Sequence, residues 1–373
     1  MNDVMGIIKT GGIYEGLKEL TISRSSAAIP FGGRYRIIDF ILSDMVNSGI
    51  RNVGVITQNN YHSLMDHLGS GKEWDLDRKK DGLFILPPYV TTKNSGWYRG
   101  SVDALYNNIS YIRRSIQKYT LLSGSNSIYN TSFDEMLDFH IAKKADITVM
   151  YKKMDFMDRA NLSKYGIIDM NNRSRIVDIE EKPKNPKTLN VLMDVCILER
   201  ELLKELVEEA YSRGRYEWVK DILIEKFNKL KIYGYCYQGH WDYIDNIKSY
   251  YNASIDMLKS STREELFPAN RPIYTKIKDE PPAKYKGSSR VINSIVADGS
   301  VIEGEVINSI IFRGVNIKKG AIVKNSIIMQ NTVVGERSEL DCVILDKDVC
   351  INSEKRIIGQ SNFPIALPKK MVI

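Results

Sequence analysis

Cysteine and histidine are scarce in this chain, and each occurs only four times among its 373 residues. The cysteines show no CxxC spacing and have no set of histidines near them, so the sequence predicts no zinc site. We expect free thiols, as in a reducing cytoplasm. No histidine is paired with a serine or cysteine nucleophile, so we assign none of them an acid–base role. The residues are Cys196, Cys236, Cys342, Cys350, His62, His67, His140 and His240, and the first three of these histidines lie in expected helices.

Long apolar runs and a strong charge are also absent. No run approaches membrane-spanning length, and the first residues lack the charged segment, apolar core and cleavage site of a signal peptide. The formal net charge of +7 is moderate and spread along the chain, without a basic stripe interleaved with aromatic residues. We therefore expect a soluble, cytoplasmic protein that binds neither membranes nor nucleic acid. A positive field still favours small anions such as sugar phosphates or nucleotides.

Apolar strand-like runs alternate with helical patterns over residues 1–258. This alternation predicts an α/β domain on a mostly parallel, mixed sheet, with ligands at the carboxyl ends of the strands. A polar segment punctuated by prolines, residues 259–285, is expected to be a linker. The expected strands are 4–8, 53–57, 83–86, 120–123, 147–151 and 195–198, and the expected helices include 37–48, 102–116, 133–144 and 247–258.

Short pairs of β-branched residues recur every five or six positions in residues 286–373, separated by Gly, Asn, Ser or Asp. This period predicts a parallel β-helix of hexapeptide repeats, with Val301, Val306, Ile317 and Val323 as inward candidates. An ordinary β-sandwich of short strands is the alternative, and the short period favours the β-helix. Flat faces and exposed ends of such a solenoid commonly mediate assembly, so we expect an oligomer.

The segment Ile7–Phe40 has the frame of a loop that binds nucleotide phosphates. The apolar run Val4–Ile8 reads as a buried strand, and Gly11 and Gly12 break it into a loop. Phosphate loops favour small residues that let the backbone approach oxygen atoms, and a cation usually completes the site. Here Tyr14 and Glu15 stand where small residues are wanted, whereas Gly16 and Ser26 stand where a cation is expected.

Motifs along almost the whole chain carry a family resemblance. They include PFGGRYRIIDF at 30–40, NSGI at 47–50, WDLDR at 74–78, GWYRGS at 96–101, YGI at 165–167 and EKP at 181–183. Together they closely resemble the signatures of bacterial ADP-glucose pyrophosphorylases, the glucose-1-phosphate adenylyltransferases. The resemblance implies a Rossmann-like nucleotidyltransferase domain over residues 1–258 and a left-handed hexapeptide β-helix over residues 286–373.

The family transfers AMP from ATP to glucose 1-phosphate and releases pyrophosphate in bacterial glycogen synthesis. The crowded phosphate charges require Mg²⁺, held by two carboxylates, and cationic side chains. This sequence departs from the family at those positions. Asn126 and Tyr243 replace the two metal-binding aspartates, and Gly16 and Ser26 replace the arginine and the lysine of the loop. In the sugar pocket, Leu192 and Asp194 stand where the family has serine and glycine.

Other positions still match residues that bind ligands in the family. The match implies residual nucleotide binding by Gly11, Gly12, Gln58, Trp97, Arg99 and Asp103, and residual glucose 1-phosphate binding by Gly166, Glu181 and Lys182. The alternative is that these residues persist only as scaffold. Asp242 and Asp245 flank the lost aspartate, but neighbouring positions point in different directions and do not replace a lost ligand.

The combined losses resemble the GlgD-type subunit of ADP-glucose pyrophosphorylase. The resemblance implies a non-catalytic, regulatory subunit that binds no metal cofactor itself and modulates a GlgC-type catalytic partner, which uses Mg²⁺, in a heterotetramer. ATP, glucose 1-phosphate and allosteric metabolites are candidate ligands. The alternatives are an independent nucleotidyltransferase with a rearranged site and a sugar-phosphate or nucleotide sensor. Acyl transfer by the β-helix is disfavoured because no histidine follows His240.

Overall fold

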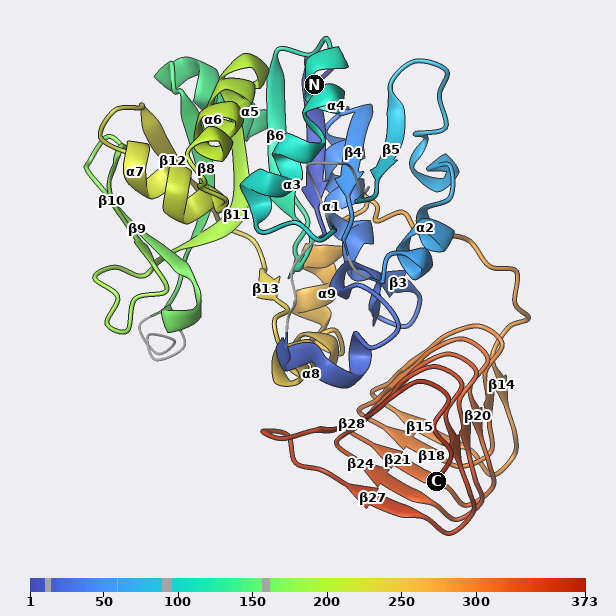
Figure 1. Ribbon diagram of the computed structural model, residues 1–373. Coiled ribbons are helices and arrows are strands. Elements are labelled where there is room, and N and C mark those ends of the chain that lie inside the picture. The colour runs from blue at the N-terminus through green and yellow to red at the C-terminus, as the bar shows by residue number, and fades with distance from the viewer. Residues whose placement is uncertain (11–14, 59, 89–95, 156–161) are drawn as a thin grey trace.

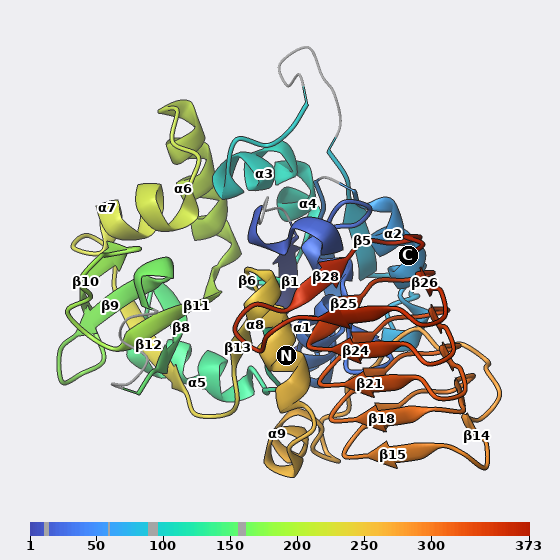
Figure 2. The ribbon, with the colours of Figure 1, turned by 90° about the horizontal axis from the view of Figure 1, so that it is seen from below.

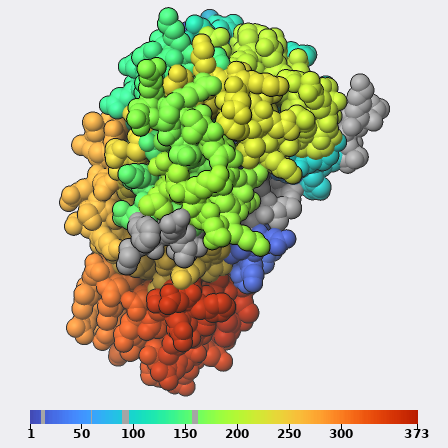
Figure 3. Space-filling view, turned by 90° about the vertical axis from the view of Figure 1, so that its left-hand side faces the viewer, coloured from blue at the N-terminus to red at the C-terminus, as the bar shows by residue number. Residues whose placement is uncertain are grey.

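The chain folds into an α/β part and a β-helix that lie against each other (Figure 1). The computed structural model describes residues 1–10, 15–58, 60–88, 96–155 and 162–373. In the described part of the chain, no helix is both long enough and apolar enough to cross a membrane. Figure 3 shows the β-helix packed closely against one end of the α/β part.

A mixed sheet of nine strands forms the centre of the α/β part. Its order is β10-β9-β11-β6-β1-β4-β5, with β8 paired to both β11 and β12. The pairs that include β1 and β4 are parallel, whereas β11 runs antiparallel to β6 and β8. The strands are β1 (Val4–Lys9), β4 (Asn52–Ile56), β5 (Gly82–Leu86), β6 (Tyr119–Gly124), β8 (Ile147–Lys153), β9 (Gly166–Met170), β10 (Ile176–Glu181), β11 (Asn190–Glu199) and β12 (Ile232–Tyr237).

Helices cover both faces of this sheet because the buried strands present apolar side chains in both directions. Alternation along β1 divides the core: Val4 and Ile8 pack with α1, α2 and α5, while Met5 and Ile7 pack with α3, α4 and α6. The helices are α1 (Ile37–Asn47), α2 (His62–Leu68), α3 (Ser101–Asn107), α4 (Ile109–Arg114), α5 (Asp134–Lys143), α6 (Arg200–Ser212), α7 (Ile224–Lys226), α8 (Ile247–Asp256) and α9 (Ser260–Leu266).

Four short strands and several single turns complete the α/β part. The strands form two small two-stranded sheets, β2 with β3 and β7 with β13. Their bounds are β2 (Pro30–Phe31), β3 (Tyr35–Arg36), β7 (Ser127–Ile128) and β13 (Asp242–Tyr243), and the turns are η1 (Glu15–Leu20), η2 (Ser26–Ala28), η3 (Lys72–Trp74) and η5 (Val219–Leu223).

Three parallel sheets of five strands each form the left-handed β-helix (Figure 2). Ladders of like residues tie successive coils: Asn293 donates to Asn308, and Asn325 donates to Asp341. The strands are β14 (Lys284–Tyr285), β15 (Arg290–Ile292), β16 (Ile295–Val296), β17 (Val301–Ile302), β18 (Glu305–Ile307), β19 (Ile310–Ile311), β20 (Asn316–Ile317), β21 (Ile322–Lys324), β22 (Ile327–Ile328), β23 (Val333–Val334), β24 (Glu339–Asp341), β25 (Val343–Leu345), β26 (Cys350–Ile351), β27 (Arg356–Ile358) and β28 (Ile365–Leu367).

One face of the β-helix is docked on the α/β part. An apolar cluster joins η1, α1 and α8 to Ile310, Phe312 and other residues of the coils. At its edge Arg24 and Asp346 form an ion pair at 2.9 Å, with side chains only 2% and 1% exposed. Because apolar packing and a buried ion pair both cross this contact, the two parts form one packed unit.

The sequence-based expectations include six of the nine strands of the central sheet and differ from the structure in several places. Val301 is half-buried, and its neighbour Ile302 points into the β-helix instead. The expected helix 102–116 is two helices, because α3 ends at Asn107 and α4 begins at Ile109. The segment expected as a linker contains α9, whose Leu266 is buried, and the first β-helix strand. All four cysteines are free, but only Cys196 is fully buried.

Candidate functional site

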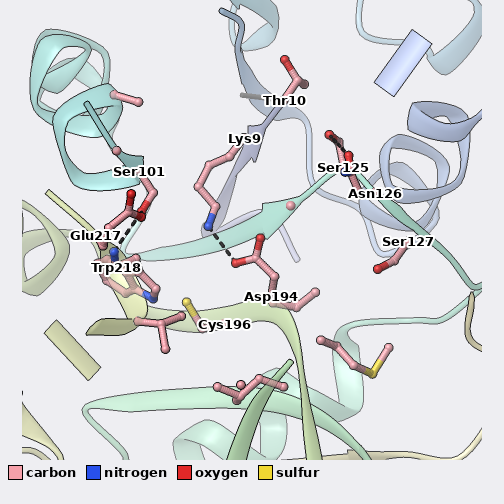
Figure 4. A pocket seen from close by; sticks show the side chains of 18 of the residues that line it. Lys9, Thr10, Ser101, Ser125, Asn126, Ser127, Asp194, Cys196, Glu217 and Trp218 are labelled. Carbon is pink, nitrogen blue, oxygen red and sulfur yellow. Dashed lines mark hydrogen bonds and ion pairs between the residues drawn. The ribbon is translucent and has the colours of Figure 1, made fainter. Parts of the chain in front are cut away.

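A cavity of about 590 Å³ opens at the carboxyl ends of β1, β4 and β6. β11 and the residues around Glu217 and Trp218 close its other side (Figure 4). This is the edge where ligands bind in open α/β sheets. The cavity brings together several of the expected positions: Gln58, Arg99, Asn126, Gly166, Glu181, Lys182, Leu192, Asp194 and Tyr243.

An ion pair lies on the floor of the cavity. The Lys9 ammonium is 2.7 Å from a carboxylate oxygen of Asp194, and Figure 4 shows the two side chains pointing toward each other. Lys9 ends β1 and Asp194 lies in β11, on either side of β6. A Cβ atom on Gly124 of β6 would lie 2.3 Å from the other carboxylate oxygen of Asp194, so only glycine leaves room for the pair.

Asn126, which the family motif predicts at the position of the first metal-binding aspartate, is buried among hydroxyl groups. Its side-chain oxygen accepts hydrogen bonds from Ser26 at 3.0 Å and Ser125 at 3.4 Å. The residue is 5% exposed, and its amide nitrogen has no partner among the described residues. Two of the replaced positions, Ser26 and Asn126, are therefore in direct contact. The amide nitrogen of Asn126 is a donor without a partner among the described residues, whereas a cation needs acceptors.

Tyr243, which the family motif predicts at the position of the second aspartate, belongs to an aromatic cluster. Its ring lies 5.3 Å from that of Tyr165 and 6.2 Å from that of Trp241. β13 places Tyr243 opposite Ser127 in a two-stranded antiparallel pair, next to Asn126. The aromatic ring lines the cavity and offers no carboxylate to a metal ion.

The two flanking carboxylates have other partners. Asp242 lies 2.6 Å from His240, and this hydrogen bond raises the pKa of that imidazole. Asp245 pairs with Lys164 at 3.2 Å and accepts from Ser249 near the start of α8. Neither aspartate lines the cavity, and the described residues contain no group of three potential metal ligands. The residues at the two metal positions therefore do not fit Mg²⁺.

Gly16 lies outside the cavity lining and packs against the residues before α8. A Cβ atom there would lie 2.7 Å from the Cβ of Asn246 and 2.8 Å from the carbonyl oxygen of Asp245. Asn246 is held in place as the N-cap of α8, where its side chain accepts from the Ser249 amide. An arginine at position 16 would collide with this helix start.

On the sugar side, Leu192 fills space and two charged residues remain at the rim. A Cβ atom on Gly166 would lie 3.0 Å from a methyl carbon of Leu192. Glu181 and Lys182 are exposed and line the cavity, and the backbone nitrogen of Lys182 donates to Tyr165. The Glu181 carboxylate and the Lys182 ammonium therefore lie at the rim of the cavity, beside the apolar side chain of Leu192.

On the nucleotide side, the expected residues interact mainly with the protein itself. Gln58 donates to the carbonyl of Tyr98 at 3.1 Å. Arg99 bonds both oxygens of the buried Asp103 and lies 3.8 Å over the ring of Tyr216. Trp97 is 62% exposed and does not line the cavity. Gly11, Gly12 and Tyr14 lie outside the described residues.

Several cavity residues escaped the sequence analysis, and Lys9 and Glu217 are two charged examples. Lys9 ends an otherwise apolar strand, and that break in the pattern was the available signal. Glu217 accepts a hydrogen bond from Ser101, and burial raises its pKa. It has no sequence signal, because it lies in a loop whose position depends on distant contacts with α3.

The chain resembles known proteins over most of its length. The profile of the family described as "Nucleotidyl transferase" matches residues 5–260, and that of "GlmU-like, C-terminal hexapeptide" matches residues 281–362. A glucose-1-phosphate adenylyltransferase of Clostridium perfringens strain 13 is 36% identical over 336 residues, 89% of this chain and 84% of that protein. The chain belongs to the glucose-1-phosphate adenylyltransferase family.

Glucose-1-phosphate adenylyltransferases of other organisms extend the similarity to nearly the full length. The glucose-1-phosphate adenylyltransferase of Bacillus cereus ATCC 10987 is 33% identical over 361 residues, which cover 96% of this chain and 95% of that protein. That of Geobacillus stearothermophilus is 36% identical over 86% of this chain and 83% of its own length. Within this family, the present chain combines the family's two-part architecture with a cavity that offers donors and an aromatic ring at the metal positions.

Proposed function

We propose that this member of the glucose-1-phosphate adenylyltransferase family is a regulatory subunit with an impaired site of its own. It assembles with a GlgC-type catalytic subunit in a heterotetramer and modulates the formation of ADP-glucose from ATP and glucose 1-phosphate in bacterial glycogen synthesis. Its four free cysteines fit a reducing compartment, and the proposed place of action is the cytoplasm.

The environment of Asn126 carries this proposal. Transfer of AMP needs a divalent cation to neutralise phosphate oxygens, and Mg²⁺ prefers carboxylate ligands. Asn126 instead presents an amide whose oxygen already accepts two hydroxyl donors. Tyr243, at the second position, is packed among aromatic rings and offers no carboxylate to a metal ion. Loss of one preorganised electrostatic contact typically lowers the rate by ~10²–10³-fold.

Gly16 and the docked β-helix support the same proposal. Gly16 cannot carry a cationic side chain while the start of α8 lies against it. The apolar docking of the β-helix is retained, so the chain keeps a packed architecture that can present surfaces to a partner. A regulatory effect then arises when contacts across that interface favour the active conformation of the catalytic subunit.

The decisive experiment measures ADP-glucose formation by three samples: the purified chain, the purified catalytic partner and the co-purified pair. We expect the chain alone to be slower than the partner by about 100-fold or more. We expect the pair to differ from the partner alone in rate or in response to metabolites. The matched control is a pair whose catalytic subunit has lost its metal-binding aspartates, and this pair should be inactive.

Two outcomes would overturn the proposal. Activity of the chain alone close to that of the partner would indicate an independent nucleotidyltransferase with a rearranged site. Activity that persists in the pair with the inactivated catalytic subunit would place the chemistry in this chain.

A further inference from the structure

Lys9 is the cation that lies deepest in the cavity. Arg99 and Lys164 also line the cavity, but each is paired with an aspartate outside the lining, and Lys182 is exposed at the rim. The Lys9 side chain is only 11% exposed, and its partner Asp194 is itself a lining residue. The cavity therefore contains both a cation suited to an anionic ligand and a carboxylate bound to that cation.

The backbone at Asp194 is in a conformation that glycine adopts more easily than aspartate. Its φ is +54°, in the left-handed region, and the pairing of β11 with β8 shifts register between Leu192 and Cys196. A side chain in this region generally costs energy that glycine avoids. The ion pair with Lys9 offsets this cost. No other described residue forms an ion pair with the Asp194 carboxylate or the Lys9 ammonium.

The donors around Lys9 would suit an anion if the carboxylate were removed. The amide nitrogen of Asn126 has no partner among the described residues, and Lys9 and Asn126 both line the cavity. The thiol of Cys196 stays neutral, because burial raises its pKa to about 12. Glu217 is the second carboxylate near Lys9, but its oxygen accepts from Ser101 at the start of α3.

We propose that Asp194 is an internal competitor for anionic ligands. Its carboxylate occupies the Lys9 ammonium and repels a second negative charge, so the natural chain binds phosphate esters poorly at the floor of the cavity. Removal of this carboxylate leaves Lys9 as the free cation of a phosphate site at this point of the cavity lining. That site needs no divalent cation, because the residues at the metal positions offer no carboxylate to one.

The test is calorimetric titration of the full chain with inorganic phosphate and with glucose 1-phosphate, in buffer containing EDTA. Asp194→Gly removes the carboxylate and the strained conformation together, so the variant should fold. Asp194→Asn removes only the charge and is the closest match in shape. Both should bind phosphate about 10- to 100-fold more tightly than the natural chain, the gain expected of a hydrogen bond to a freed charged group.

Two controls separate this mechanism from a change in net charge. The double variant Asp194→Gly/Lys9→Met should lose the gain. Asp178→Asn removes the same charge from an ion pair with Lys187 outside the cavity and should leave binding unchanged.

The inference is overturned if neither Asp194 variant binds more tightly, if the gain survives the loss of Lys9, or if Asp178→Asn produces the same gain. It is also overturned if the gain disappears in EDTA and returns with Mg²⁺. These measurements use the isolated chain, so their failure would leave the proposed regulatory role, which is tested with the catalytic partner, untouched.

Discussion

Removal of the carboxylate at Asp346 should strongly destabilise the protein. Asp346 lies in the β-helix and pairs with Arg24 of the α/β part at 2.9 Å, and both side chains are almost completely buried. At this separation the attraction amounts to about 6 kcal/mol with an effective dielectric constant near 20. Much of this is offset by the cost of burying both charges, but Asp346→Asn would leave the guanidinium buried without its counter-charge. We expect the free energy of unfolding to fall by about 3–5 kcal/mol.

Denaturant unfolding checks this value through tryptophan fluorescence and circular dichroism. All four tryptophans precede residue 258, so fluorescence reports on the α/β part, whereas circular dichroism reports on both parts. The apolar double variant Arg24→Met/Asp346→Leu should recover most of the loss, because it leaves no unpaired charge. Glu354→Gln, which breaks an exposed pair with Arg337, should change stability by less than about 1 kcal/mol. The reasoning is refuted if Asp346→Asn is no more disruptive than this control.

Two further predictions concern the same domain contact and the replaced metal positions. Burial lowers the pKa of Lys347 to about 7, so its charge is unfavourable in the folded state and this penalty is complete below pH 7. Lys347→Met should therefore be more stable than the natural chain at pH 6 by roughly 2–5 kcal/mol, and unfolding at pH 6 and pH 9 should show that difference shrinking as the pH rises. The double variant Asn126→Asp/Tyr243→Asp should bind Mn²⁺ measurably, by electron paramagnetic resonance, where the natural chain does not. Equal Mn²⁺ binding by both chains would contradict the assignment of these positions.

The sequence was sufficient for the parts of the fold that depend on local patterns. The buried strand at Val4–Lys9 follows from an apolar run, and the coils follow from a repeat near six residues. Val301 was misassigned because two adjacent β-branched residues share a two-residue strand, and the pattern does not tell which one points inward. The hairpin of β9 and β10 was missed because its strands are short and carry acidic residues beside their buried isoleucines.

The candidate site was predictable only where a motif marked it. The replacements at Asn126 and Tyr243 were inferred from the family motif. The contacts that these two side chains make were not predicted. The contact of Ser26 with Asn126 joins residues 100 positions apart, and the ion pair of Lys9 with Asp194 joins residues 185 apart. Such contacts arise from strand order in the sheet, and no local pattern in a single sequence encodes them.

The packing at Gly16 makes the loss of the loop arginine difficult to reverse. Once position 16 has no side chain, the start of α8 can close to 2.7 Å from the place where a Cβ atom would lie. A single substitution back to arginine would then have to displace a capped helix that is packed, through Tyr250 and Tyr251, on the β-helix as well. An arginine at position 16 therefore requires simultaneous changes at the start of α8, so no single substitution supplies that cation.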